Sequence, residues 1–285
     1  MFDTIIIGAG PSGISASLYL KRANKNVLIV YNVNSELNSA IKIDNYYGFE
    51  DGINGKNLYL KGILQAKNLG ISIVQEEVLD IKIDEKMNYL VTTAQNEYYA
   101  SSLIIATGTK RLKPNIKNLK EFEGLGVSSC AICDAFFYRN KKVAVLGSGN
   151  YAISEANVLK NVTNDITILT NGDDKSYNNY KTNTKKIVTF EGNKKLEYIT
   201  FEDNTKESFD GVFLAYGTAN GIDFAKKLGI VQKNDCIIVN DNMQTNIPGV
   251  YACGDVVQGL HQVCKAVYDG CKAGLSCIEY INNKN

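Results

Sequence analysis

Tryptophan is absent from this sequence, proline occurs three times, and His261 is the only histidine. So few imidazoles argue against a zinc site, because zinc is held by four ligands. No apolar run reaches the roughly 18 residues that a membrane-spanning helix needs. The net charge is +1, so no overall charge attracts nucleic acid or a membrane surface. We therefore expect neither nucleic acid nor membrane as a partner.

A basic leader segment and a cleavage site are also missing, and Met1 is followed directly by an apolar strand. We expect a cytoplasmic protein, in which seven cysteines do not form a secreted disulfide framework. Two of the seven, Cys130 and Cys133, stand close together. The others are interpreted as small buried side chains: Cys236, Cys253, Cys264, Cys271 and Cys277.

The first thirty residues have the pattern of a βαβ unit. "TIIIGAG" predicts a buried strand, "PSGISASLYLKRAN" a helix, and "NVLIVY" a second strand. Between strand and helix lies a complete GxGxxG, formed by residues 8–13. Its glycines allow a tight turn and a close approach to a pyrophosphate, which the helix N-terminus then faces. This placement predicts a dinucleotide site.

A second unit of the same kind begins at Lys141 with "KKVAVLGSGNYAISEANVLKNV", which carries a GxGxxA turn. Further strands are predicted to end at Ala106-Thr107-Gly108 and at Gly254-Asp255, with a last helix from about residue 262. This order predicts a split organisation. Residues 1–111 and 242–285 form one domain, and residues 112–241 form a second domain inserted into it.

Cys130 and Cys133 are three residues apart in "SSCAICDAFF". Such a pair is either a redox dithiol, half of a zinc site, or two structural cysteines. The zinc interpretation is weak, because the sequence has no second CxxC and one histidine. A dithiol has a lowered thiol pKa near a helix N-terminus, and Asp134 can exchange a proton with a thiolate. Together with a nucleotide-binding scaffold, the dithiol indicates electron transfer through a flavin.

Several segments together resemble the low-molecular-weight thioredoxin reductases over the whole chain: "GAGPSG", "IDNYYGFEDGINGKNL", "ATG", "CAICDAFF", "VLGSGNYAISEA" and "IPGVYACGDV". The resemblance implies an α/β fold of two Rossmann-like, three-layer domains that bind FAD and NAD(P)-type nucleotides, the second inserted into the first. It also implies FAD as cofactor, a thioredoxin as substrate, and a homodimer. Cys133 would face the flavin, Cys130 would attack the substrate disulfide, and Asp134 would be the acid–base.

The resemblance further implies a set of FAD-binding positions: Gly8, Gly10, Pro11, Ser12, Gly13, Tyr31, Asn32, Asn45, Val78, Ala106, Thr107, Gly108, Gly254, Asp255, His261, Gln262 and Val263. Two departures concern this set. His261 replaces the usual arginine, and the strand that the family ends in glutamate ends here in Tyr31 and Asn32.

A third departure concerns the electron donor. The family's second unit grips the NADPH 2′-phosphate with a His-Arg-Arg signature, whereas this strand ends in Thr170-Asn171-Gly172, followed by two aspartates. Charge-assisted partners for a phosphate are therefore missing, which disfavours NADPH. Within the family the chain most resembles the ferredoxin-dependent flavin thioredoxin reductases. We expect docking of an acidic ferredoxin on Lys110, Arg111 and Lys113, or on Arg139, Lys141 and Lys142.

Three alternatives stay open on the sequence alone. One is an NAD(P)H-dependent thioredoxin reductase with an atypical nucleotide site, since Asp173 could reach a 2′-hydroxyl. Another is an FAD-dependent oxidase of small dithiols. The last is a flavin-binding relic that acts as a partner or sensor. For any reductase of this kind we expect the inserted domain to swing about hinges near residues 111–117 and 240–246.

Overall fold

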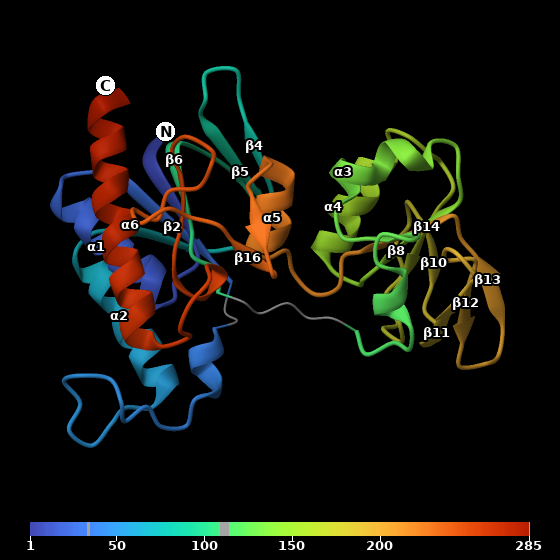
Figure 1. The fold of residues 1–285 in the computed structure, drawn as a ribbon, viewed down its shortest axis with the longest axis horizontal. Coiled ribbons are helices and arrows are strands. Elements are labelled where there is room, and N and C mark those ends of the chain that lie inside the picture. The colour runs from blue at the N-terminus through green and yellow to red at the C-terminus, as the bar shows by residue number, and fades with distance from the viewer. Residues whose placement is uncertain (33–34, 109–113, 285) are drawn as a thin grey trace. The chain divides into compact units, whose positions relative to one another are not determined.

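The computed structural model describes residues 1–32, 35–108 and 114–284 (Figure 1). The chain forms two compact units. The first consists of Met1–Lys110 with Asn220–Asn285, and the second of Arg111–Ala219. Both are α/β units, so the predicted fold class is confirmed.

The first unit is built on a sheet to which seven strands of the described chain belong, in the order β3-β2-β1-β6-β5-β4 with β17 paired to β6. Five of them run parallel, and β4 and β5 form an antiparallel hairpin. The strands are β1 (Phe2–Ile7), β2 (Val27–Tyr31), β3 (Ser72–Gln75), β4 (Val78–Ile83), β5 (Tyr89–Thr93), β6 (Glu97–Ile105) and β17 (Val250–Ala252). Runs of Ile and Val form the central strands because β-branched side chains pack well on a pleated surface.

Three helices cover one face of this sheet: α1 (Pro11–Arg22), α2 (Gly55–Asn68) and α6 (Val263–Lys284). Ile6, Ile29 and Ile104 of the sheet share a core with their apolar faces. Helices α1 and α6 pack closely, since a Cβ added at Gly270 would lie 2.1 Å from the Ser12 carbonyl oxygen. The shorter elements of the unit are η1 (Glu36–Ser39), β15 (Gln232–Lys233), β16 (Cys236–Ile237) and η4 (Gly254–Val256).

The second segment of the first unit begins at Asn220, whereas the sequence predicted that it begins at residue 242. Helix α5 (Gly221–Leu228) packs beside β4, and the Lys227 ammonium lies 3.3 Å from the Asp80 carboxylate. The segment 240–246 is likewise part of this unit, since Gln244 bridges to Tyr251. The second unit therefore ends at Ala219 and not at residue 241, and the ion pair of Lys227 with Asp80 ties α5 to the first unit. The hinge expected near 240–246 stays a prediction.

The second unit has a parallel sheet in the order β10-β9-β8-β14-β7 and an antiparallel sheet in the order β11-β12-β13. A shared apolar core joins the two sheets, and α3 and α4 complete the unit. The strands are β7 (Val127–Ser128), β8 (Val143–Leu146), β9 (Ile166–Leu169), β10 (Lys181–Asn183), β11 (Ile187–Glu191), β12 (Tyr198–Phe201), β13 (Lys206–Ser208) and β14 (Gly211–Leu214). The helices are η2 (Leu119–Phe122), α3 (Ala131–Asp134), η3 (Ala135–Tyr138) and α4 (Asn150–Leu159).

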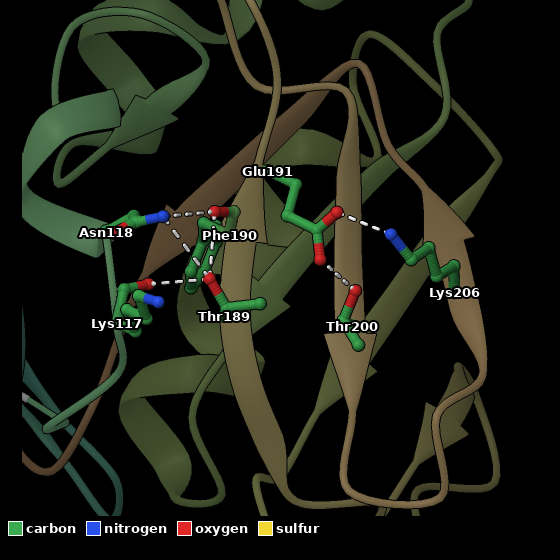
Figure 2. A network of polar contacts seen from close by, with 7 residues as sticks. All are labelled: Lys117, Asn118, Thr189, Phe190, Glu191, Thr200 and Lys206. Atoms are coloured by element: carbon green, nitrogen blue, oxygen red, sulfur yellow. Dashed lines mark hydrogen bonds and ion pairs between the residues drawn. The ribbon is translucent and has the colours of Figure 1, made fainter.

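The segment that enters the second unit is fastened to its antiparallel sheet (Figure 2). Lys117 exchanges backbone hydrogen bonds with Val188 and Phe190, at 3.3 and 3.1 Å. Asn118, in a left-handed conformation with φ of 61°, donates from its side chain to the Phe190 carbonyl at 3.3 Å. Of the hinge predicted at 111–117, residues 111–113 lie outside the described residues. Lys117, the last residue of this range, is fixed to the antiparallel sheet by its two backbone hydrogen bonds.

In the ranges that the structure describes, no helix combines the length and apolarity required to cross a membrane.

Candidate active site

Cys130 and Cys133 form a disulfide at the start of α3, with 5.4 Å between their Cα atoms. Cys130 is the N-cap of this helix, and its sulfur accepts a hydrogen bond from the Cys133 backbone N–H at 3.3 Å. When the disulfide is reduced, the same N–H stabilises a thiolate at Cys130. The two positions differ in access, since Cys130 is buried and Cys133 is exposed.

Ser128 links the disulfide to Asp134, a function that the sequence analysis did not assign to it. Its hydroxyl donates to the Asp134 carboxylate at 2.6 Å and accepts from the Cys130 backbone N–H at 3.1 Å. The Asp134 backbone N–H in turn donates to the Cys130 carbonyl at 3.2 Å. The Asp134 side chain is therefore oriented by the loop that carries the first cysteine.

Glu155 of α4 is a second residue that the sequence analysis missed. It is 1% exposed, and its carboxylate accepts a hydrogen bond from the Ala131 backbone N–H at 2.9 Å. The signal was present in the sequence, because Glu155 follows the buried Tyr151 and Ala152 at helical spacing. A carboxylate thus supports the first turn of α3 from inside the unit.

Within the described part of the chain, no three His, Cys, Asp or Glu side chains come together as a metal site. The two cysteines that could have served zinc are joined to each other.

The first glycine turn lies between β1 and α1, as predicted, and Pro11 is the first helical residue. Two of its glycines are required for packing, since a Cβ at Gly8 would lie 2.3 Å from the Ala106 carbonyl oxygen and one at Gly13 would lie 2.0 Å from the Gly8 carbonyl oxygen. Gly10 is different, because a Cβ there would meet no described atom within 4 Å. Gly10 is also the N-cap and has no side chain to cap the helix. The α1 N-terminus is therefore open to an anion.

Asp255 lies at the other glycine turn of the first unit, in η4. Gly254 has φ of 80°, and a Cβ there would lie 2.5 Å from the Ser12 hydroxyl, so η4 touches the start of α1. Burial raises the pKa of Asp255, against the opposing charges of His261 and Lys265. One of its carboxylate oxygens is buried without a hydrogen-bond partner among the described residues. Such an atom fits a hydroxyl group of a bound ligand.

A buried ion pair that the sequence analysis did not identify fixes this turn. The Lys265 ammonium lies 2.7 Å from the Asp269 carboxylate and donates to the Gly254 carbonyl at 3.0 Å. Asp269 accepts from the Gly254 backbone N–H at 3.2 Å. The i,i+4 spacing of the two residues at the start of α6 was the available signal.

Asn45 and Gln262, far apart in the sequence, are brought together. The Asn45 side-chain amide donates to the Gln262 side chain at 2.9 Å. Val263 begins α6 beside them, and His261 is exposed. Thr107 and Gly108 follow the end of β6 and are half-buried. These predicted flavin-side positions lie in the first unit with both glycine turns, and the disulfide lies in the second unit.

The remaining predicted FAD positions are less available to a ligand. The Tyr31 hydroxyl donates to the Gln75 side chain at 3.4 Å, and Asn32 is half-buried. Val78 is 6% exposed, so its side chain belongs to the core. Ala106 is also buried, beneath Gly8.

The cysteines outside the disulfide were all predicted to be buried, and this prediction is wrong for three of them. Cys253 and Cys277 are buried, Cys236 and Cys271 are partly exposed, and Cys264 is exposed. Cys264 lies in the first turn of the long, partly exposed helix α6, where one side of the helix faces solvent.

The model of the pyridine nucleotide-disulphide oxidoreductase family matches residues 2–270. A thioredoxin reductase of Ureaplasma parvum is 34% identical over 310 residues, covering 100% of this chain and 98% of its own length.

Two solved structures are similar over nearly their whole length. The crystal structure of an atypical thioredoxin reductase from Desulfovibrio vulgaris Hildenborough has a TM-score of 0.94 and 34% identity, with 100% of this chain and 99% of that chain covered. A ferredoxin-flavin thioredoxin reductase from Clostridium acetobutylicum has a TM-score of 0.74 and 31% identity, with 99% and 98% covered.

Proposed function

Since the chain belongs to the pyridine nucleotide-disulphide oxidoreductase family, and within it to the low-molecular-weight thioredoxin reductases, we propose that it reduces the disulfide of a thioredoxin with electrons from a reduced ferredoxin. It is an FAD-dependent oxidoreductase. The observation that carries the choice of donor is the end of β9, where Thr170-Asn171-Gly172 offers no cation for a 2′-phosphate.

We assign the FAD site to the two glycine turns of the first unit. The open N-terminus of α1 at Gly10 holds the pyrophosphate, and the buried, unpartnered oxygen of Asp255 accepts a hydrogen bond from a hydroxyl group of the cofactor. Asn45, Gln262 and Val263 hold the flavin end. When bound, FAD accepts electrons singly or in pairs and passes a pair on to a disulfide.

The dithiol is the second half of the mechanism. Reduction of the Cys130–Cys133 bond takes up two electrons and two protons and leaves two thiols. Cys130 is buried in the disulfide form, so it must become accessible when the bond opens. Its thiolate, which the Cys133 N–H stabilises, then attacks a sulfur of the substrate disulfide and releases the other substrate sulfur, which Asp134 protonates. Cys133 then attacks Cys130 in the mixed disulfide, which restores the internal bond and releases the second substrate thiol. Asp134 is kept in reach of both steps by Ser128.

Ferredoxin as donor is consistent with the energetics. A plant-type ferredoxin near about −400 mV and a thioredoxin near about −270 mV leave about 130 mV, or about 6 kcal/mol for two electrons. The ferredoxin-flavin thioredoxin reductase from Clostridium acetobutylicum is similar over nearly the full length of this chain. Two electrons must arrive one at a time from such a donor, which a flavin permits.

We place the thioredoxin-binding surface beside the disulfide. Phe136 and Phe137 are 71% and 67% exposed, and Ile132 is 50% exposed, all within four residues of Cys133. Exposed aromatic side chains next to a redox centre are typical of a protein-binding surface. Replacing Phe137 with Ala should raise KM for thioredoxin severalfold and leave turnover of a small aromatic disulfide unchanged. An equal loss with both substrates would contradict this surface.

For ferredoxin we propose the basic group Arg139 and Lys141. The Arg139 guanidinium lies over the Phe136 ring and the Lys141 ammonium over the Tyr138 ring, both at 5.7 Å, and both residues are exposed. Lys142, expected in the same group, is paired with Glu207 at 3.0 Å and is less available. The expected alternative at Lys110, Arg111 and Lys113 lies outside the described residues.

Charge reversal tests this docking group. Lys141→Glu should slow ferredoxin-driven reduction at low salt, and the effect should shrink as salt screens the charges. Lys194→Glu, at an exposed turn of the other sheet, is the matched control. Equal rates for the two variants would exclude the Arg139–Lys141 group.

We propose a homodimer formed through α1 and α2. Leu64 and Leu69 of this region are 56% and 41% exposed, and they line a groove of about 520 Å³ with Leu18 and Arg22. Leu64→Asp should turn a dimer into a monomer in light-scattering measurements. A parent protein that elutes as a monomer would contradict the proposal.

The deciding experiment is anaerobic. Flavin absorbance is followed while NADPH, NADH and reduced ferredoxin are added separately in the presence of thioredoxin. Bleaching by ferredoxin alone, with new thioredoxin thiols, is the expected result. Rapid bleaching by a nicotinamide would overturn the choice of donor. Rapid release of hydrogen peroxide with a small dithiol in air would favour the oxidase alternative instead.

A further inference from the structure

The second glycine turn, Gly147-Ser148-Gly149, has the form of a nucleotide site. It lies between β8 and α4, and the N-cap of α4 is Gly149, which has no side chain. In such a unit the pyrophosphate lies at the turn, and the adenosine ribose lies between the turn and the tip of the next strand. In this protein that strand is β9, and its tip is Thr170. What occupies the space between Ser148 and the β9 tip therefore decides whether a dinucleotide can bind.

The side chains at the strand tip are turned inward. Thr170 is 2% exposed, and its hydroxyl donates to the Asp173 backbone carbonyl. The Asn171 side chain accepts from the Ile187 backbone N–H at 2.8 Å. Neither side chain is free to hold a ribose hydroxyl.

The next residues return to the turn. Lys175, two residues after Asp173, links the Asp173 carboxylate to the backbone of Ser148. The Lys175 ammonium lies 3.4 Å from the Asp173 carboxylate and 3.4 Å from the Ser148 carbonyl oxygen. The Lys175 backbone N–H also donates to Asp173, at 3.3 Å. The loop after β9 is thus tied to the middle residue of the glycine turn through Lys175, which keeps the Asp173 carboxylate beside that turn.

The charge at this position opposes a nucleotide. Interaction with the Ser148 side chain and with Lys175 lowers the pKa of Asp173, so its carboxylate stays ionised at neutral pH. A pyrophosphate at the turn would bring two more negative charges next to it, and like charges a few ångströms apart repel strongly. Lys175, the nearest cation, is already paired with Asp173.

We propose that Asp173 is a specificity-determining residue that excludes the ADP half of NAD(P)H from the second glycine turn, through the fixed negative charge that its carboxylate places beside this turn. This deepens the proposed function, because it gives a cause for the rejection of nicotinamide donors. It differs from the missing 2′-phosphate partners, since it acts against NADH as much as against NADPH.

The test is direct binding of ADP-ribose to the FAD-loaded protein by calorimetry, with anaerobic bleaching by NADH as a second readout. Asp173→Ser should bind ADP-ribose at least tenfold more tightly than the parent. Asp173→Asn removes the charge in the same shape and should gain part of this affinity. Asp174→Ser, an equal charge change at the exposed neighbour, is the control and should gain none. Lys175→Met leaves the carboxylate in place and should also gain none.

Equal affinities for the Asp173 and Asp174 variants would overturn the proposal. So would a loss of binding in Asp173→Ser, which would make Asp173 a ribose ligand. If Lys175→Met gained as much affinity for ADP-ribose as Asp173→Ser, the exclusion could not be assigned to the Asp173 carboxylate. A different result would contradict the proposed function itself: tight binding of ADP-ribose by the parent protein, together with rapid bleaching of its flavin by NADH.

Discussion

One carboxylate oxygen of Asp255 is buried with no hydrogen-bond partner in the described parts of the chain, and burial raises the pKa of the group. A carboxyl whose folded pKa is raised binds more protons in the folded state, so its contribution to stability falls as pH rises above about 4. The unpaired acceptor lowers the stability of the cofactor-free protein. A bound cofactor that donates a hydrogen bond to it removes this cost, so the residue favours cofactor binding.

Asp255→Asn tests this at the residue scale. FAD affinity should fall about tenfold to a hundredfold, because a hydrogen bond to a charged acceptor is lost. The apoprotein should become more stable than the parent apoprotein above about pH 5 and no more stable near pH 3, since only the ionised form carries the cost. Urea unfolding of both apoproteins across this range measures the difference. A uniform loss of stability at every pH would contradict the assignment.

The cysteines outside the disulfide should differ in their reactivity toward alkylating reagents. Burial raises the pKa of Cys253 to about 12 and that of Cys277 to about 11. Thiolates are the reactive species, so both should resist iodoacetamide at pH 8 in the native protein, while exposed Cys264 is labelled first. Mass spectrometry of digests over time gives the order. Labelling of Cys253 as fast as that of Cys264 would contradict the burial of Cys253.

At the scale of elements, the contact of α1 with α6 holds both glycine turns of the first unit together. Gly270→Ala would place a Cβ 2.1 Å from the Ser12 carbonyl oxygen and force the helices apart. We expect a loss of about 1–3 kcal/mol in unfolding free energy, together with weaker FAD retention. Gly62→Ala in α2 is the control, because its nearest atoms are Ile14 carbons at 3.6 Å or more. It should be neutral or stabilise by up to about 1 kcal/mol.

Sequence patterns identified the elements that local chemistry determines. The GxGxxG at residues 8–13 placed β1, α1 and β2 correctly, because glycine turns and apolar periodicity are local signals. The sequence patterns did not show that α5 belongs to the first unit. That assignment depends on the ion pair between Lys227 and Asp80, which lie some 150 residues apart in the sequence. Ser128 and Glu155 were missed for a related reason: a serine or glutamate has no motif of its own until its hydrogen-bond partner is known.

At the scale of the whole molecule, two compact units predict two unfolding transitions. A ligand that binds one unit raises the unfolding temperature of that unit alone. The size of the increase depends on the ratio of the ligand concentration to Kd. Calorimetry of the apoprotein with increasing FAD should move one transition to higher temperature and leave the other in place. A single transition that moves as a whole would show that the units unfold together.

Strand β6 pairs with β5 through its first half and with β17 through its second half, and α1 packs on α6. Both late partners, β17 and α6, are made after the entire second unit. On the ribosome, therefore, the CxxC unit can fold while the first unit still lacks an edge strand and a covering helix. Gly254, Asp255 and Gln262 are among the last residues to emerge. If FAD binds at the site proposed above, the flavin is acquired only when synthesis is almost finished, and a chain truncated before β17 would carry the Cys130–Cys133 disulfide without a flavin to reduce it.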